Sequence, residues 1–383
     1  MSFKLHYFRE LSNPGTKDLR IVEINSAFPL DRSESCPACD SRLNVLAELI
    51  GEDNTIINLG ACNNCGYIGY MARPQEGWSS EYYLDEWAAN FRIYKIRKLN
   101  PRKKKVVEKA AQLLLDRNAP IFEVGFGKGD IMKGFRDLGF TNILGIENSR
   151  WLADFVQKNL GIKPYVGSME LDKNTTTIER QKLVISWHVI EHSFNPNKFL
   201  ENISKLQENG DLLVLGLPNA EAEPMTQTVF WLPHLHAFSK PALEAILNRH
   251  CYELLSDDSE VDDEIIFFAR KTISPKPKLK ISGDYLEKYR SRLRNYFFIP
   301  SLRIGERYCF AWSPKKFHAH IYRVSNLEFI DRIRLFLKRV FYYASARLFR
   351  QFSNERSFVY SKFEDDDLPF KIRYDGNIKL LVR

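Results

Sequence analysis

Residues 121–130 read Ile-Phe-Glu-Val-Gly-Phe-Gly-Lys-Gly-Asp, and this stretch decides the fold of the central part of the chain. A short apolar run that carries one acid, Glu123, is followed at once by glycines at positions 125, 127 and 129. The pattern predicts a buried parallel strand that turns sharply into a helix over 131–138, with glycines that let a ligand approach the backbone closely. Glycine-rich turns after strands are common, so the interpretation depends on the segments that follow.

Two further segments lie at informative distances from this turn. Residues 142–147 predict a second strand, and Glu147 stands 18 residues after Gly129, close to the spacing at which a carboxylate meets a nucleoside ribose. Alternating strand and helix signals predict an α/β fold, a doubly wound Rossmann-like sheet with a mostly parallel core, in which ligands bind at the carboxyl ends of the strands. The expected strands lie near 120–125, 142–147, 164–166, 182–186 and 211–217, and the expected helices near 129–138, 150–160, 197–207 and 240–249.

These segments, together with Trp-His-Val-Ile-Glu-His at 187–192, resemble the class I S-adenosylmethionine (SAM)-dependent methyltransferases over about residues 95–270. The resemblance is to the branch whose fourth motif reads like His-Val-Leu-Glu-His. The glycine spacing also differs from the Gly-x-Gly-x-x-Gly turn of dinucleotide enzymes, which is suited to a pyrophosphate. SAM has no phosphate and carries a sulfonium cation, so the acids Glu123 and Glu147 suit such a ligand.

The resemblance implies a set of SAM-binding residues. The three glycines would admit the methionine portion, Glu123 would act on its amino group, and Glu147 would accept hydrogen bonds from the ribose hydroxyls. Ser168 stands where the family often has an acid that contacts adenine, and Phe126 stands where a smaller residue is commoner. The full expected set is Glu123, Gly125, Gly127, Gly129, Glu147, Asn148, Ser168, Met169, Ser186 and Trp187.

His188, Glu191 and His192 are candidate catalytic residues. On a short helix, residues 188 and 192 would share a face, and a histidine near neutral pKa is a natural base for a hydroxyl or an acidic carbon. The alternative is that this motif only shapes the loop around SAM. A metal site is a further interpretation, which we set aside because the sequence suggests no further ligands. His236 is a fourth candidate, since His234 and His236 lie in a segment that resembles the family's His-Leu-x-x-Phe-Ser and could contact the acceptor.

Four cysteines form two Cys-x-x-Cys pairs with 22 residues between them. Two such pairs can supply a tetrahedral four-thiolate zinc site, which is structural because no coordination position stays open. Redox-active dithiols and incidental cysteines are the alternatives. The expected zinc ligands are Cys36, Cys39, Cys62 and Cys65. An acidic and aromatic stretch at 81–87 follows, which predicts either a helix of the core or a lid over the SAM site.

The net charge of +8 is unevenly distributed along the chain. Residues 274–383 hold 24 lysines and arginines against 11 acids, a net +13, whereas the remainder holds 32 against 37, a net −5. Residues 274–278 predict a linker, and residues 327–352 predict a basic amphipathic helix. Such a helix more often packs on its own domain than docks on a membrane surface or on nucleic acid. It would also suit a phosphate-bearing or lipid-linked acceptor.

These features predict three domains: a zinc ribbon with the lid segment at 1–95, a SAM-dependent methyltransferase domain at 96–273 and a basic, aromatic C-terminal domain at 274–383. The N-terminus has no apolar signal core, and no run reaches the roughly 18 apolar residues of a membrane span. We therefore expect a cytoplasmic protein, with peripheral contact to a membrane surface through the basic tail as a further option.

An N-terminal zinc ribbon joined to this catalytic pattern resembles the methyltransferases of sugar and surface-polysaccharide biosynthesis. The resemblance implies methyl transfer from SAM to a sugar, nucleotide-sugar or lipid-linked glycan. A hydroxyl is the expected acceptor rather than a carbon, because the carbon-methylating group usually adds an α/β domain that this tail does not resemble. The alternatives are an RNA methyltransferase and a non-catalytic zinc-ribbon scaffold. The net acidic catalytic and zinc segments argue against nucleic acid, and the intact motifs argue against a scaffold.

Overall fold

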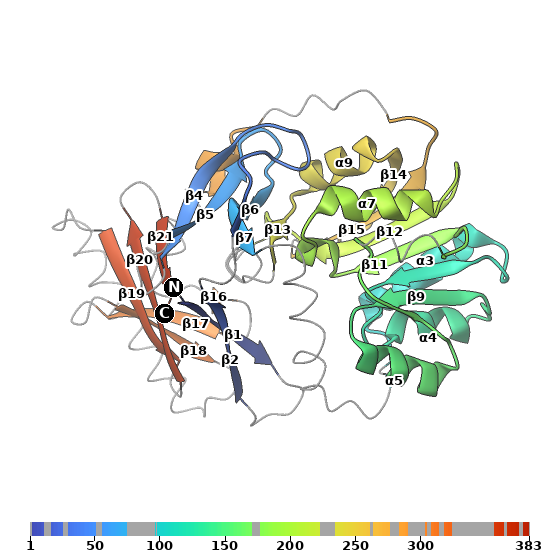
Figure 1. Ribbon diagram of the computed structural model, residues 1–383, viewed down its shortest axis with the longest axis horizontal. Coiled ribbons are helices and arrows are strands. Elements are labelled where there is room, and N and C mark those ends of the chain that lie inside the picture. Colours follow the sequence, from blue (N-terminus) through green and yellow to red (C-terminus); the bar gives the residue numbers. More distant parts are fainter. Residues whose placement is uncertain are drawn as a thin grey trace.

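The computed structural model describes residues 33–46, 58–73, 96, 98–170, 177–222, 234–260, 263–275 and 283–289 with their side chains, and the backbone of further strands nearer both ends of the chain. Figure 1 shows two groups of elements. The middle of the chain, drawn from teal to yellow, surrounds one sheet with helices. The blue strands β4, β5 and β6 and the red strands β19, β20 and β21 lie in a second sheet.

The middle segment forms a seven-stranded sheet in the order β10-β9-β8-β11-β12-β15-β14. The first five strands of this order run parallel, and β15 and β14 are antiparallel to their neighbours. Strands β8, β9 and β10 follow one another outward in the sheet, and the chain then returns to place β11 on the other side of β8. The order therefore reverses between β8 and β11, and ligands bind at such a switch point. The bounds are β8 (Ile121–Val124), β9 (Ile143–Glu147), β10 (Tyr165–Val166), β11 (Leu183–Trp187), β12 (Leu212–Pro218), β14 (Tyr252–Asp257) and β15 (Glu264–Lys271).

The central strands are buried along their whole length, as expected of parallel strands that helices cover on both faces. Two of the helices begin at side-chain caps. Asn100 accepts a hydrogen bond from Lys103 N at 2.8 Å, and Ser239 accepts one from Ala242 N at 3.2 Å. The bounds are α3 (Pro101–Leu114), α4 (Asp130–Asp137), α5 (Arg150–Leu160), the 3₁₀ turn η1 (Ile190–His192), α7 (Pro196–Lys205) and α9 (Lys240–Arg249).

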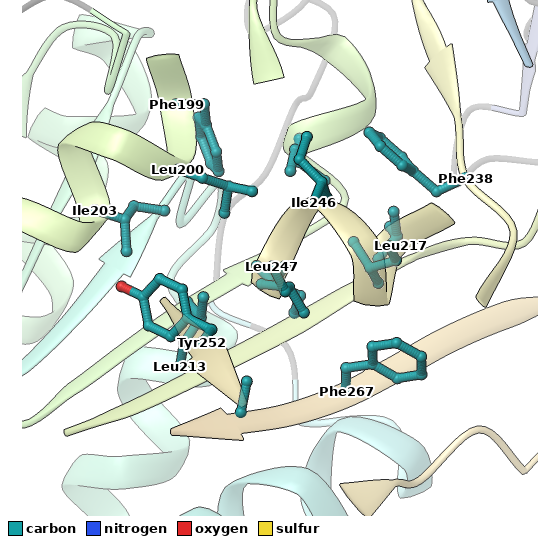
Figure 2. Packing of buried hydrophobic residues seen from close by; sticks show 14 of the residues in the cluster. Phe199, Leu200, Ile203, Leu213, Leu217, Phe238, Ile246, Leu247, Tyr252 and Phe267 are labelled. Carbon is teal, nitrogen blue, oxygen red and sulfur yellow. The ribbon is translucent and has the colours of Figure 1, made fainter. Parts of the chain in front are cut away.

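The helices cover the two faces of the sheet and give it two hydrophobic cores. Helices α3, α4 and α5 pack on one face, and α7 and α9 pack on the other. Figure 2 shows the second core, in which side chains of both helices meet those of β12, β14 and β15. Its labelled members are Phe199, Leu200, Ile203, Leu213, Leu217, Phe238, Ile246, Leu247, Tyr252 and Phe267. The expected α/β class and mostly parallel sheet are confirmed.

The second sheet joins the two ends of the chain. Its order is β13-β6-β5-β4-β21-β20-β19-β18-β17-β16, and β21 runs parallel to β4. The segments that we predicted as separate domains at 1–95 and 274–383 therefore share one sheet. The bounds are β4 (Leu43–Ile50), β5 (Ile56–Cys62), β6 (Ile68–Tyr70), β13 (His236–Ala237), β16 (Arg303–Ile304), β17 (Tyr308–Ser313), β18 (His318–Arg323), β19 (Arg356–Phe363), β20 (Asp366–Tyr374) and β21 (Ile378–Val382).

Two smaller antiparallel pairs complete the strands near the N-terminus. They are β1 (Ser2–Glu10) with β2 (Lys17–Asn25), and β3 (Leu30–Arg32) with β7 (Ala72–Pro74). The expected lid at 81–87 and the expected basic helix at 327–352 lie outside the described residues. Within the part of the chain that is described, no helix combines the length and the apolar character needed to cross a membrane.

Candidate functional site

A cavity of about 530 Å³ lies at the carboxyl ends of β8, β9, β10 and β11. This is the switch point of the sheet, and the volume falls within the range of small-molecule sites. The turns that follow the four strands supply most of the wall. The lining consists of residues 123–128, 146–148, 167–170 and 187–189, with Lys103, Asp130, His192, Ser193, Phe199 and His234.

The three glycines after β8 have different roles. All three have positive φ values, of 68°, 53° and 72° at Gly125, Gly127 and Gly129. A Cβ atom on Gly127 would meet no described atom within 4 Å, so this position is open. A Cβ on Gly125 would collide with the Val189 side chain, and one on Gly129 would lie 2.8 Å from Val156 Cγ2 on α5.

We expected all three glycines to admit a ligand, and this expectation needs correction at Gly129. Gly125 and Gly127 line the cavity, whereas the described lining does not include Gly129. Gly129 instead precedes α4 in the left-handed conformation and lets that helix pack closely against α5.

Two buried carboxylates face the cavity. Glu147, at the end of β9, accepts hydrogen bonds from Gly127 N at 2.9 Å and from Ser149 N at 3.1 Å. Glu123 accepts one from Met132 N at 3.1 Å. Desolvation raises the pKa of both carboxyl groups, and the nearby charge of Asp130 adds to the rise in the pKa of Glu123. A bound cation would offset the cost of keeping these groups ionised away from water.

The other expected cofactor residues lie mostly at the same cavity. Asn148, Ser168, Met169 and Trp187 line it, whereas Ser186 is buried within β11 and is not part of the described lining. Lys103 and Asp130 also line the cavity, and the sequence analysis did not predict either. Lys103 pairs with Asp130 at 3.0 Å and lies 5.7 Å from the centre of the Trp187 ring.

Glu170 is another lining residue that sequence analysis missed. Its two carboxylate oxygens accept hydrogen bonds from Phe194 N at 3.0 Å and from Asn195 N at 2.6 Å. These bonds fasten the segment after η1 to the turn after β10. The same turn carries Ser168 and Met169. Glu170 therefore connects the part of the cavity wall formed by these two residues to the segment that follows the histidine motif.

The histidine motif has a geometry that we did not expect. His188 has a left-handed φ of 56° and precedes the short turn η1, so residues 188 and 192 do not share the face of a regular helix. Both rings instead approach the buried carboxylate of Glu191. His188 Nδ1 lies 3.4 Å from Glu191 Oε1, and His192 Nε2 lies 3.8 Å from the same oxygen. A left-handed conformation at a residue other than glycine is costly and recurs at functional sites.

His188 is held between two acids. Its Nε2 lies 2.7 Å from Glu264 Oε1, and Glu264 pairs in turn with Arg102. Desolvation opposes protonation, but the close Glu191 carboxylate and the hydrogen bond with Glu264 prevail and raise the pKa of His188 to about 9. His188 is therefore positively charged at neutral pH. Our expectation of a histidine base near neutral pKa does not fit this residue.

His192 and His234 form the histidine part of the cavity wall. Their ring centres lie 4.7 Å apart, and the rings meet edge to face. His192 comes from η1, whereas His234 comes from the segment before β13, more than forty residues later in the chain. The fold thus brings a third histidine to the motif at 188–192, and sequence spacing alone did not indicate that contact.

Known proteins resemble the middle of this chain. Residues 95–256 match the family described as Methyltransferase domain. We use the name methyltransferase domain for these matched residues. The seven-stranded sheet has the fold of the SAM-dependent methyltransferases. No curated protein matches the chain.

Several solved structures are similar to this methyltransferase domain. They include the CcbJ methyltransferase from Streptomyces caelestis, with 15% identity over 50% of this chain and 98% of that chain and a TM-score of 0.40. The magnesium protoporphyrin IX methyltransferase from Synechocystis PCC 6803 with bound SAH has 13% identity over 52% of this chain and 100% of that chain, with a TM-score of 0.39. The CurJ carbon methyltransferase has 15% identity over 51% of this chain and a TM-score of 0.38, and the chain spans 57% of its length.

The four cysteines gather into one cluster beside the methyltransferase domain. Their Sγ atoms all lie within 4.8 Å of one another, with separations of 3.5 Å for Cys36–Cys65, 3.4 Å for Cys39–Cys62 and 3.6 Å for Cys39–Cys65. These separations are far too long for disulfide bonds of about 2.05 Å. Four thiolates at about 2.3 Å from one tetrahedral ion would lie roughly 3.8 Å apart. The cluster therefore fits a metal ion.

Hydrogen bonds attach the cysteine turns to the methyltransferase domain. The Pro37 carbonyl accepts from Asn197 Nδ2 at 3.0 Å and from Arg249 Nη1 at 2.9 Å. Ser239, which caps α9, donates to the Cys65 carbonyl. Strand β13 also pairs with β6, so both knuckles of the ribbon contact elements that carry or flank the cavity.

The buried side chain of His236 connects the cysteine ribbon to the segment that follows the histidine motif. Its Nε2 donates to the Ser193 carbonyl at 2.9 Å, and its Nδ1 accepts from the Tyr67 hydroxyl. Desolvation and the charge of Arg73 lower the pKa of His236 to about 3. The ring is buried and is not among the described lining residues, so our expectation that His236 contacts the acceptor does not fit its position.

The buried neutral His236 predicts a pH dependence of stability. Its folded-state pKa is depressed below the ordinary value of about 6.5, so its contribution to stability is present above pH 6.5 and is lost as pH falls toward 3. We expect this residue to cost the native protein about 2 kcal/mol of unfolding free energy between pH 6.5 and 5. Urea denaturation of the native protein and of His236→Asn at pH 7, 6 and 5 measures the effect.

The variant should be less stable at pH 7, because it loses the bonds to Tyr67 and Ser193, but its stability should fall less between pH 7 and 5. Tyr67→Phe keeps the buried imidazole and removes one of its partners, so it should retain the steep acid dependence. Equal slopes for the native protein and His236→Asn would contradict the assignment.

Proposed function

We propose that the chain transfers a methyl group from SAM to a hydroxyl of a sugar, glycan or glycan precursor. The observation that supports this most is a single cavity at the switch point that has buried carboxylates on one side and a pair of histidines on another. The first group suits a cationic nucleoside donor, and the second suits a weakly acidic acceptor.

The donor would lie across the carboxyl ends of β8 and β9. Glu147 already accepts two backbone hydrogen bonds and retains capacity to accept from the ribose hydroxyls. The open Cα face of Gly127 leaves room for the methionine portion. Glu123 and Asp130 would offset the positive charge of the amino and sulfonium groups, because both acids line the cavity. Ser168 and Met169 would flank the adenine.

The reaction is an in-line displacement, for which the protein must align the donor and acceptor atoms at short range. The acceptor oxygen attacks the methyl carbon, the bond between that carbon and sulfur breaks, and the sulfur keeps the electron pair as S-adenosylhomocysteine (SAH) forms. The hydroxyl loses its proton during transfer. We assign the activation of the hydroxyl to the part of the wall formed by His192 and His234, with the Glu191 carboxylate next to them.

We infer the class of the acceptor from the elements that surround the His192 and His234 wall. The cysteine ribbon contacts the segment that carries His234, through the pairing of β13 with β6. Such a ribbon next to the catalytic pattern resembles the methyltransferases of sugar and surface-polysaccharide biosynthesis. The net charge of +13 over 274–383 would favour a phosphate-bearing acceptor, such as a nucleotide-sugar or a lipid-linked glycan.

We also propose that the four-cysteine cluster holds a structural zinc ion. Four thiolates saturate a tetrahedral ion, so the metal would take no part in methyl transfer. Its role would be to fix the two turns that hydrogen-bond to Asn197, Arg249 and Ser239.

The donor assignment predicts the effect of Glu147→Gln. The amide loses the negative charge and presents an NH₂ group close to the Gly127 and Ser149 amides, so we expect SAM to bind at least about tenfold more weakly, equivalent to about 1.4 kcal/mol. Isothermal titration with SAM and SAH, with NADH as a ligand that should not bind, measures the change.

Glu108→Gln is the matched control for this titration. Glu108 lies on α3, away from the cavity, and its contact with Lys104 at 3.7 Å is solvent exposed. This variant should bind SAM as the native protein does. If Glu147→Gln bound SAM with native affinity, the proposed donor site would be wrong.

The acceptor is tested with SAM that carries a labelled methyl group. Purified protein is incubated with nucleotide-sugars, phospholipid-linked glycans and RNA, and the label is followed into each fraction. Base-stable label in a sugar fraction supports the proposal, and its position is then assigned by NMR. Label in RNA alone, or methylation of carbon, would replace the proposed acceptor. SAM binding without transfer to any of these fractions would overturn the proposed glycan acceptor while leaving the donor site intact.

The zinc assignment predicts that Cys36→Ser loses bound metal and stability. A thiolate ligand is replaced by a poor one at a buried position, so we expect less than one zinc per chain by atomic emission and a clearly lower melting temperature. Cys251→Ser is the control, because Cys251 lies outside the cluster and should leave the zinc content unchanged. Full zinc content in Cys36→Ser would contradict the assignment.

A further inference from the structure

Glu191 is buried without adequate hydrogen-bond partners. Its side chain is 1% exposed, and neither carboxylate oxygen has a hydrogen-bond partner among the described residues. A buried charged group without such partners carries a large desolvation cost. Nitrogen atoms of His188 and His192 lie 3.4 Å and 3.8 Å from Glu191 Oε1, and neither forms a hydrogen bond with it.

Two histidines complete a set of possible metal ligands around this carboxylate. One ligand atom from each of Glu191, His192 and His234 lies within 4.8 Å of the other two. Of the three residues, His192 and His234 line the cavity, and Glu191 lies behind them. His188, which also lines the cavity, contacts the same Glu191 oxygen at 3.4 Å and is itself bonded to Glu264.

We propose that Glu191, His192 and His234 bind a divalent transition-metal ion at the cavity wall. Two imidazoles and one carboxylate are the ligand set of catalytic zinc sites and of other divalent ions of the first transition row. Ligand atoms at about 2.0–2.2 Å from one ion lie roughly 3.4 Å apart in a tetrahedral site and roughly 3 Å apart in an octahedral one, so the 3.8 Å between His192 Nε2 and Glu191 Oε1 requires a movement of less than about 1 Å.

This site differs from the cysteine cluster in one decisive respect. The four cysteines close the coordination sphere of their metal, whereas three ligands leave positions open. Because His192 and His234 face the cavity, an open position would face it too. His188 would stabilise the arrangement from outside the coordination sphere, through its contact with the Glu191 carboxylate.

The proposed role of the ion rests on the proposed function and deepens it. An ion bound at this wall would coordinate the acceptor hydroxyl, lower the pKa of that hydroxyl and hold its oxygen toward the methyl group. The hydroxyl proton would pass to water, so neither His192 nor His234 would need to accept it. Metal binding itself does not depend on which acceptor the protein uses.

The test uses Mn²⁺ and full-length protein whose cysteine cluster is already loaded with zinc. Mn²⁺ favours nitrogen and oxygen ligands over thiolates, so it should leave that cluster alone. The free-Mn²⁺ signal in electron paramagnetic resonance is followed as protein is added. We expect one Mn²⁺ per chain, and at least about tenfold weaker binding in both Glu191→Gln and His234→Gln.

His250→Gln is the matched control. His250 donates to Asn197 Oδ1 at 3.0 Å outside the cavity, so its loss removes a histidine without touching the proposed ligands. This variant should bind Mn²⁺ as the native protein does. Titration of each variant with SAM, without added metal, reports on the fold and the donor site. If Glu191→Gln fails to fold, His234→Gln decides, because His234 is supplied by a different segment.

Three results would overturn the metal site: no Mn²⁺ bound to the native protein, binding that survives both ligand substitutions, or binding that is lost equally in His250→Gln. A native protein that binds one Mn²⁺ in a manner sensitive to Glu191 and His234, yet binds no SAM, would support the metal site and contradict the proposed methyl transfer. The two proposals therefore fail through different measurements.

Discussion

The hydrogen bond from the Gly127 amide to the Glu147 carboxylate ties together the ends of two adjacent strands, and the cavity depends on it. Gly127 takes its left-handed conformation without strain because it has no side chain, and Glu147 fixes the turn in that conformation. The same carboxylate accepts from Ser149 N, at the start of α5. One buried acid thus sets the position of the β8 turn, the end of β9 and the following helix, which together form the donor side of the cavity.

The opposite side of the cavity is held by contacts between distant parts of the chain. His236 joins Tyr67 of the ribbon to the Ser193 carbonyl, and Glu170 holds the amides of Phe194 and Asn195. Both sets of bonds converge on the segment just after the histidine motif. The ribbon is therefore part of the support of the methyltransferase domain, and the pairing of β6 with β13 makes that support continuous with a sheet.

Local features of the sequence predicted the parallel strands and the helices between them, because strand burial and helix periodicity depend on residues close in sequence. They missed β14 and β15, and they assigned Gly129 to ligand binding, although its partner is Val156 on the next helix. The charge of His188 depends on Glu264, 76 residues away, and the position of His234 depends on a pairing with the ribbon. Contacts of this kind follow from the assembled fold, so spacing along the chain did not reveal them.

The segment between Asn219 and Phe238 is fastened at its base. Asn219 and Phe238 form a parallel bridge, and Ala220 N donates to the Phe238 carbonyl at 2.8 Å. Once the two ends of a segment are fixed, its length adds little to the cost of folding, about 0.6 kcal/mol for each doubling. A change of length between Ala222 and His234 would therefore cost the fold little, provided that the bridge and the pairing of β13 with β6 are kept. The anchored base thus separates the residues that must keep their place, such as His236, from a stretch whose length is free to vary.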